Sequence, residues 1–201
     1  MGLWQRLFRN PPTPEPVETT EDDQLERHLV LLAEHGFTPR GAVEVDDNDA
    51  YRRRPLTTLL TSTADGRPLF PRVFIDADEL SRTTAVALPG FVLAAAEHAG
   101  TGAEVHGVRV MCDPKSTSTG SLRLTRGWDV VDHSFDLGEA GDEVVEDAIL
   151  QSVAPQGHDA FTFYAQPDLT PVTLWLGSGT DDSLIDALLA ENAEVAEAAE
   201  A

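Results

Sequence analysis

The sequence predicts an α+β fold, with a mainly antiparallel sheet of about five to seven strands and helices packed on it. Helix and strand patterns follow the order helix, hairpin, helix, meander, helix, hairpin, helix, which is not a regular β–α alternation. The 201 residues are enough for one substantial core, and no internal repeat of about 20 to 50 residues is visible. We therefore expect a single domain over residues 20–192.

Residues 1–10 have the pattern of a short amphipathic helix, with large apolar side chains on one face and arginines off that face. The proline-rich residues 11–19 form an extended linker. The segment could dock on a protein partner, on its own domain or on a membrane surface. Burial of four large apolar side chains yields about 6 to 12 kcal/mol, and ordering the segment consumes most of it. Extra packing contacts therefore favour a protein partner over lipid. The candidate binding residues are Leu3, Trp4, Arg6, Leu7, Phe8 and Arg9.

The domain begins with a predicted helix from Thr20, whose hydroxyl forms a capping-box-like start with Asp23. Gly36 ends this helix, and Phe37 is expected to pack back on Leu32. The acidic residues 44–49 then read as a solvated loop, because a calcium loop would need glycine at position six and glutamate at position twelve. The dense basic cluster that follows is a candidate site for an anionic partner: Arg52, Arg53 and Arg54.

A β-hairpin is predicted over residues 56–75. Two apolar and β-branched runs, residues 56–61 and 69–75, flank a turn that contains Asp65 and Gly66. Pro68 and Pro71 lack the amide donor of a central strand. We therefore expect the second run to be an edge strand that pairs through residues 72–75.

The second half of the chain alternates between helices and hairpins. Helices are predicted over residues 91–99, from residue 142 to 152 and from residue 180 to 192, and the acidic Ala/Glu tail 193–201 is expected to fray. Residues 105–111, 122–126 and 130–135 form a predicted meander, and residues 161–164 and 172–176 form a second hairpin. The hydroxyl-rich residues 113–120 read as a hairpin loop, because they lack the glycine and lysine order of a phosphate-binding loop.

One stretch of the chain has a distinctive order of segments. A strand that ends at Asp76 is followed by DADEL, AVALP, GFVLAAAEHAG and VRVMCDP. Over residues 56–114, about a third of the chain, this layout resembles the N-terminal domain of SseB-type (enhanced serine sensitivity) proteins. The chain departs from that pattern at Cys112-Asp113-Pro114, where an asparagine-proline turn is absent. The resemblance implies an α+β binding or regulatory domain without a known catalytic centre.

Acidic side chains dominate the composition, with 35 Asp and Glu against 14 Lys and Arg and a formal net charge of −21. Such a body repels phosphate, so nucleic acid is not an expected partner. No apolar run reaches the roughly 18 residues of a membrane span, and the first residues lack a secretory signal, so we expect a cytoplasmic protein. Cys112 is the only cysteine, which excludes an intramolecular disulfide and predicts a small buried side chain.

No catalytic signature is present in the sequence. His133 lies between Asp132 and Asp136, but adjacent strand residues point to opposite faces, so Asp132 cannot orient His133 as a catalytic acid would. We therefore predict a non-enzymatic binding or regulatory protein that docks a protein partner through residues 1–10, without cofactor or metal. The alternatives are a hydrolase-like enzyme that uses the hydroxyl-rich loop and a histidine, and a peripheral membrane protein.

Overall fold

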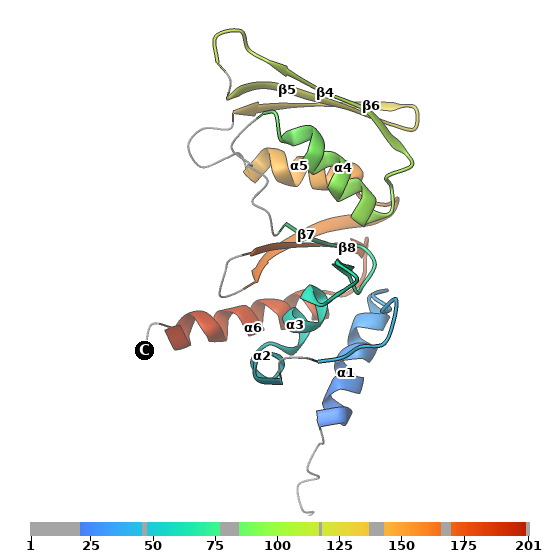
Figure 1. Cartoon of the computed structure of the whole chain (residues 1–201), viewed down its shortest axis with the longest axis vertical. Helices are drawn as coiled ribbons and strands as arrows, with labels where there is room; N and C mark the ends of the chain where they lie inside the picture. Colours follow the sequence, from blue (N-terminus) through green and yellow to red (C-terminus); the bar gives the residue numbers. More distant parts are fainter. Residues whose placement is uncertain are drawn as a thin grey trace, which may run out of the picture.

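The computed structural model of the chain describes residues 21–45, 48–76, 85–116, 118–136, 143–165 and 170–199. These residues form six helices and eight strands, and the strands pair in three antiparallel sheets of two, three and three strands. The predicted α+β class with antiparallel pairing is therefore confirmed. Helices separate the two larger sheets, so the strands are divided among three sheets instead of joining in one (Figure 1).

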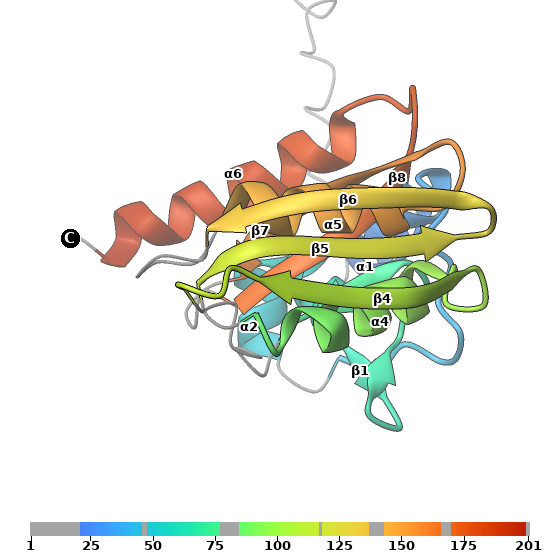
Figure 2. The same cartoon turned by 90° about the horizontal axis from the view of Figure 1, so that it is seen from above.

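The elements stack in four layers, which Figure 1 shows edge-on. The upper sheet contains, in spatial order, β4 (Val105–Cys112), β5 (Thr119–Arg126) and β6 (Asp129–Asp136). Below it lie α4 (Leu88–Ala99) and α5 (Glu143–Val153), which the upper sheet covers in the view of Figure 2. The lower sheet contains, in spatial order, β3 (Val73–Ile75), β8 (Thr170–Gly177) and β7 (His158–Ala165). The last layer consists of α1 (Glu21–Glu34), α2 (Asn48–Arg53), α3 (Pro55–Thr61) and α6 (Ser183–Ala199).

Two hydrophobic cores lie on opposite faces of the lower sheet. The first fills the space between this sheet, α4, α5 and the upper sheet, and the second lies between the other face and the helices of the last layer. Successive side chains of a strand point to opposite faces. On β8, Trp175 therefore belongs to the first core and Leu174 to the second, and both are fully buried.

The predicted meander is confirmed as β4, β5 and β6. On β5, Leu122 and Leu124 are fully buried on the face that the helices cover. Arg123 between them points outward, where its Nε lies 2.7 Å from Oδ1 of Asp132 on β6. No helix or strand of the described residues covers the other face of the upper sheet (Figure 1).

The start of β5 is tightly packed. A Cβ on Gly120 would collide with the carbonyl oxygen of Met111 and would lie 2.9 Å from the ring of Phe135. Cys112, which pairs with Gly120, is exposed, so the prediction of a buried cysteine was wrong. The reason is that β4 is an edge strand, and its last two side chains, Met111 and Cys112, are exposed.

The end of α1 is the predicted glycine stop. Gly36 has φ 81°, its amide donates to Ala33 O over 2.9 Å, and the amide of Phe37 donates to Leu32 O over 2.8 Å. These two bonds form a Schellman motif, in which glycine supplies the left-handed conformation. Phe37 and Leu32 are both fully buried in the second core, as predicted.

Residues 56–61 were predicted as a strand, and this prediction was wrong, because they form α3. Pro55 lies in the first turn, where its missing amide proton costs nothing. The carboxylate of Glu191 on α6 accepts the amides of Leu56 and Thr57 over 2.9 and 3.0 Å and the hydroxyl of Thr57 over 3.0 Å. This helix cap comes from a residue that is distant in sequence, so local β propensity could not reveal it.

The predicted turn itself is confirmed. Asp65 (φ 53°) and Gly66 (φ 73°) join β1 (Thr63–Ala64) to β2 (Arg67–Pro68) in a two-stranded hairpin. After Pro71 the chain enters β3, which forms an edge of the lower sheet, as predicted. The predicted partner was wrong, because β3 pairs with β8 and not with residues 56–61.

Two helical segments were not predicted. The acidic residues 44–49 were predicted as a solvated loop, but α2 begins at Asn48, and Arg52 Nη1 lies 3.8 Å from Asp49 Oδ1 on the solvent side. The final helix, α6, continues past the predicted boundary at Asn192 to Ala199.

Candidate functional site

The predicted catalytic candidate His133 contacts a hydroxyl but does not activate it. His133 Nε2 lies 2.9 Å from Ser152 Oγ, and this Oγ donates to the carbonyl of Ala148 over 2.7 Å. Because the single hydroxyl proton is directed to Ala148, the ring nitrogen must donate to Ser152. Asp132 is paired with Arg123 on the opposite face, as expected. Burial lowers the pKa of His133, which favours the neutral ring.

His158 is also held in a structural contact. The guanidinium of Arg72 donates to its Nε2, so the ring proton lies on Nδ1, which donates to Gln156 O over 3.1 Å. The same guanidinium donates to Gly36 O over 2.6 Å and lies 5.2 Å from the centre of the Phe37 ring. Arg72 has φ 59°, and these contacts hold it in that unfavourable conformation.

His35, Asp181 and Ser183 meet at the start of α6 but do not form a catalytic triad. Nε2 of His35 lies 3.2 Å from Asp181 Oδ1 and 3.3 Å from Ser183 Oγ, whereas Nδ1 donates to Leu31 O over 2.9 Å. In a triad the acid and the nucleophile bind different ring nitrogens. Hydrogen bonds from the Ser183 hydroxyl and amide, and then from His35, lower the pKa of Asp181. The cluster therefore holds the end of α1 against the beginning of α6.

The hydroxyl-rich loop has local hydrogen bonds only among its described residues. Ser116 Oγ lies 2.9 Å from Ser118 Oγ, and Asp113 Oδ1 accepts the Lys115 amide over 2.8 Å. Both contacts lie within the β4–β5 hairpin loop, as the sequence predicts. No contact that the structure records between described residues brings a histidine into this loop.

The predicted binding residues lie in two places. Arg52 and Arg53 form the end of α2, and Arg54 lies between α2 and α3, where its carbonyl accepts the amide of Thr58. Arg52 and Arg53 are exposed, and Arg54 is half-buried. The other candidates, Leu3, Trp4, Arg6, Leu7, Phe8 and Arg9, lie outside the described residues, so their role remains a prediction.

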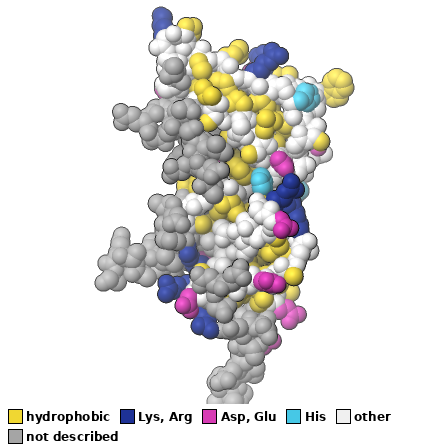
Figure 3. Space-filling model, in the orientation of Figure 1, with side chains coloured by type: hydrophobic (Ala, Val, Ile, Leu, Met, Phe, Trp, Pro, Cys, Tyr) yellow, Lys and Arg dark blue, Asp and Glu magenta, His cyan; other side chains and the backbone are white. Residues whose placement is uncertain are grey.

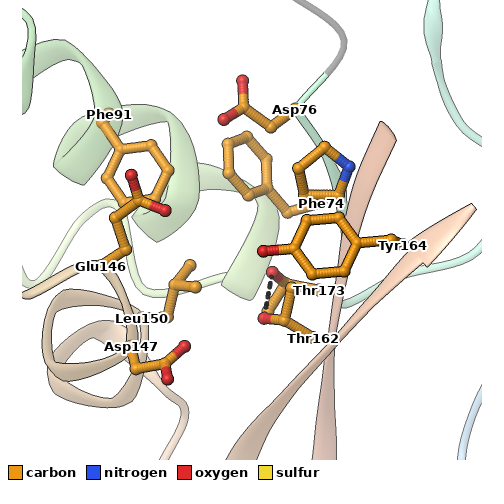
Figure 4. A pocket seen from close by; sticks show the side chains of 10 residues that line it. Phe74, Asp76, Phe91, Glu146, Asp147, Leu150, Thr162, Tyr164 and Thr173 are labelled. Carbon is orange, nitrogen blue, oxygen red and sulfur yellow. Dashed lines mark hydrogen bonds between the residues drawn. The ribbon is translucent and has the colours of Figure 1, made fainter. Parts of the chain in front are cut away.

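A small cavity of about 170 Å³ lies between the lower sheet and the two helices above it (Figure 4). We call it the acidic cavity. Its walls come from β3 and the residue after it, from α4 and α5, and from β7 and β8. The lining residues are Phe74, Asp76, Phe91, Glu146, Asp147, Leu150, Thr162, Tyr164, Pro171 and Thr173.

Three of the lining side chains carry carboxylates. Asp76 and Glu146 are 5% and 8% exposed, and Asp147 is exposed at the surface. Aromatic rings adjoin them: Phe74 and Phe91 meet edge to face, with centroids 5.7 Å apart. A site that combines carboxylates with aromatic rings is suited to an ammonium or guanidinium group, which pairs with the acids and contacts the rings.

Hydroxyl groups form the sheet side of the acidic cavity. Thr162 and Thr173 are opposite each other on β7 and β8, with their Oγ1 atoms 3.0 Å apart. The Tyr164 side chain extends into the same space in Figure 4. On the helix side, the indole of Trp175 donates to Leu150 O over 3.0 Å and holds α5 over the lower sheet. The cavity is therefore built on regular elements that a buried hydrogen bond fixes relative to one another.

A second hollow, of about 750 Å³, lies beside the β1–β2 hairpin and has lining charges of both signs. Arg40 and Arg67 face Asp65 and Glu97 around it. His98 also lines it, and its pKa is lowered mainly by burial, with a smaller contribution from the two arginines. Figure 3 shows acidic, basic and histidine side chains intermixed at mid-height on one edge of the molecule. Mixed signs do not define one ligand class, so the acidic cavity is the stronger candidate.

Within the described residues, no group of three or more His, Cys, Asp or Glu side chains is placed to hold a metal ion. No described helix is long and apolar enough to cross a membrane. Comparison of the chain with protein families, curated proteins and solved structures found no match.

Sequence reasoning missed the acidic cavity. The sequence places Asp76 at the end of a predicted strand, and no motif marks Glu146 or Tyr164 as site residues. The lining residues extend from Phe74 to Thr173 along the chain, so no local motif contains them. One signal in the sequence pointed to the cavity: Glu146 and Asp147 lie beside the apolar positions of a predicted helix. The structure buries Glu146, and a buried glutamate is rare unless it is paired or functional.

Proposed function

We propose that this chain is a non-enzymatic binding protein, acting in the cytoplasm, that takes a cationic side chain of a basic protein partner into the acidic cavity. The observation that carries the proposal is the convergence of Asp76, Glu146 and Asp147 on a cavity with aromatic walls. A lysine or arginine side chain matches this chemistry, with its apolar stem against the rings and its charged end near the carboxylates. A binding role without catalysis is also what the resemblance to SseB-type proteins implies.

The overall charge supports the same partner class. A net charge of −21 attracts basic proteins over several ångströms and accelerates their encounter with the chain. The cavity then discriminates among the basic side chains that arrive, since only an exposed lysine or arginine can enter it.

We further propose that residues 1–10 supply a second contact with the same partner. The linker of residues 11–19 gives the segment a reach of about 28 Å at about 3.1 Å per residue. Co-sedimentation with anionic vesicles tests this preference for protein. We expect little of the full chain to bind to the vesicles. Strong vesicle binding that disappears in Trp4→Ala would refute the preference for a protein partner.

Small cations test the cavity directly. We expect n-butylguanidinium and n-butylammonium to bind the full chain in the millimolar range, and n-butanol not to bind, because about five to eight heavy atoms support only a few kcal/mol. NMR titration should shift the signals of Phe74 and Tyr164. Glu146→Gln should weaken binding about tenfold, the usual effect of losing a hydrogen bond to a charged group.

Asp129→Asn is the matched control, because it removes the same charge from an exposed position on β6. It should leave the affinity for n-butylguanidinium unchanged. Equal weakening in Glu146→Gln and Asp129→Asn would show diffuse attraction to an acidic surface, and the proposal would then be wrong.

A further inference from the structure

The outer edge of β7 is closed along only part of its length. One side of β7 pairs with β8, and the other side is an edge of the lower sheet. The side-chain amide of Gln151 on α5 covers the first part of this edge: its Oε1 accepts the Ala160 amide over 2.9 Å, and its Nε2 donates to His158 O over 3.4 Å. Gln151 thus takes the hydrogen bonds that another strand would take.

The same edge is open two and four residues further on. In an antiparallel ladder, every second residue directs its amide and carbonyl away from the paired strand. Since the Ala160 amide points to Gln151, the main-chain groups of Thr162 and Tyr164 also point outward. No hydrogen bond to these outward groups is recorded from any residue that the structure describes. One helical turn before Gln151, α5 carries Asp147, a carboxylate that cannot donate to a carbonyl.

The open part of the edge adjoins the acidic cavity. The side chains of Thr162 and Tyr164 line the cavity, and their main chains form the edge. A strand paired at this edge would direct the residue opposite Thr162 or Tyr164 to the same face of the sheet, because directly opposed residues share a face. That side chain would point towards the acidic cavity.

We propose that an extended segment of a basic partner pairs with β7 at Thr162 and Tyr164 and places a lysine or arginine side chain in the acidic cavity. This inference rests on the proposed function and adds the conformation of the ligand, a β-strand added to a sheet edge. A second copy of this chain is a poor occupant, because Asp147 and Asp159 beside the edge and the net charge of −21 would repel it.

Short peptides test the inference on the full chain. The probe is an acetylated and amidated heptapeptide, Thr-Val-Thr-Arg-Thr-Val-Thr, and its affinity is measured by NMR titration. Methylation of the backbone nitrogens that would face β7 should weaken binding at least fivefold, and replacement of the arginine by norleucine should abolish it. If the methylated peptide binds as well as the parent, the strand addition is wrong.

Variants of the edge give an independent test. Thr162→Pro removes the amide that points outward and leaves the hydrogen bonds to β8 in place. An edge strand accepts proline at such a position. Thr162→Val keeps the amide and removes the same hydroxyl, so it is the matched control. We expect Thr162→Pro to weaken peptide binding at least fivefold relative to Thr162→Val. Both variants lose the same cavity hydroxyl, so their affinities for n-butylguanidinium should equal each other. Equal peptide affinities of the two variants would overturn the inference. If the unmodified chain does not bind n-butylguanidinium, the proposed function itself is refuted.

Discussion

Replacement of Glu191 by alanine should destabilise the protein by about 2 to 4 kcal/mol. The carboxylate accepts hydrogen bonds from two amides and one hydroxyl of α3, at 2.9 to 3.0 Å. Leu56 and Thr57, which carry these donors, are 2% and 3% exposed. A buried donor without a partner costs about 1 to 3 kcal/mol, and two amides therefore give about 2 to 6 kcal/mol. Because Glu191 is only half-buried, water can replace part of the loss, which favours the lower half of this range.

Urea unfolding at constant salt measures this effect. Glu191→Gln, which keeps one acceptor oxygen, should lose about half as much as alanine, and Glu97→Ala, at an exposed position on α4, should stay within about 0.5 kcal/mol of the parent. Burial lowers the pKa of His28 and raises that of Tyr51, and the negative charge of Glu191 acts upward on both, so Glu191→Gln should lower both pKa values in an NMR titration. A loss below about 1 kcal/mol for Glu191→Ala would refute the view that this residue caps α3.

Three further outcomes are expected. Burial lowers the folded-state pKa values of His28, His98 and His133 below 6.5, so the unfolded chain binds more protons than the folded chain as the pH falls. The urea midpoint should therefore be constant above about pH 6.5 and should decrease from there towards about pH 5.5. A midpoint that rises on acidification contradicts this. The melting temperature should increase with sodium chloride, because salt screens the repulsion within a chain of net charge −21; a flat or falling series contradicts this. Gly120→Ala should cost about 1 to 3 kcal/mol in urea unfolding, since its Cβ would collide with the Met111 carbonyl, and a neutral result would refute that packing.

Most of the fold could be predicted from the sequence, because most elements carry their own signals. Gly36 and Gly100 end α1 and α4, and alternating apolar residues mark the strands of the upper sheet. Two helices were exceptions: α2 begins within the predicted loop 44–49, and α3 was predicted as a strand because of the threonine and leucine in residues 56–61. The cap of α3 comes from Glu191, and its buried face is defined by the second core. Such tertiary contacts override local propensity, and a single sequence does not display them.

The acidic cavity could not be predicted for a related reason. Its carboxylates come from the end of β3 and from the first half of α5, and they meet only because both elements pack against β8. The sequence indicated that Asp76 follows a strand and that Glu146 belongs to a helix. It did not indicate which sheet face the helix would cover, and that choice decides which side chains converge.

The position of β8 between both cores determines how the molecule opens. Trp175 and Leu174 are fully buried on opposite sides of the strand, and β3 and β7 flank it in the sheet. Its amides can therefore exchange with solvent only when the whole domain unfolds, whereas those of the outer strand β4 can exchange through local fraying. The slowest hydrogen exchange should map to β8, and its rate should report the global free energy of unfolding. The two cores should then melt as one cooperative unit, although among the described residues eighteen buried side chains belong to one and sixteen to the other.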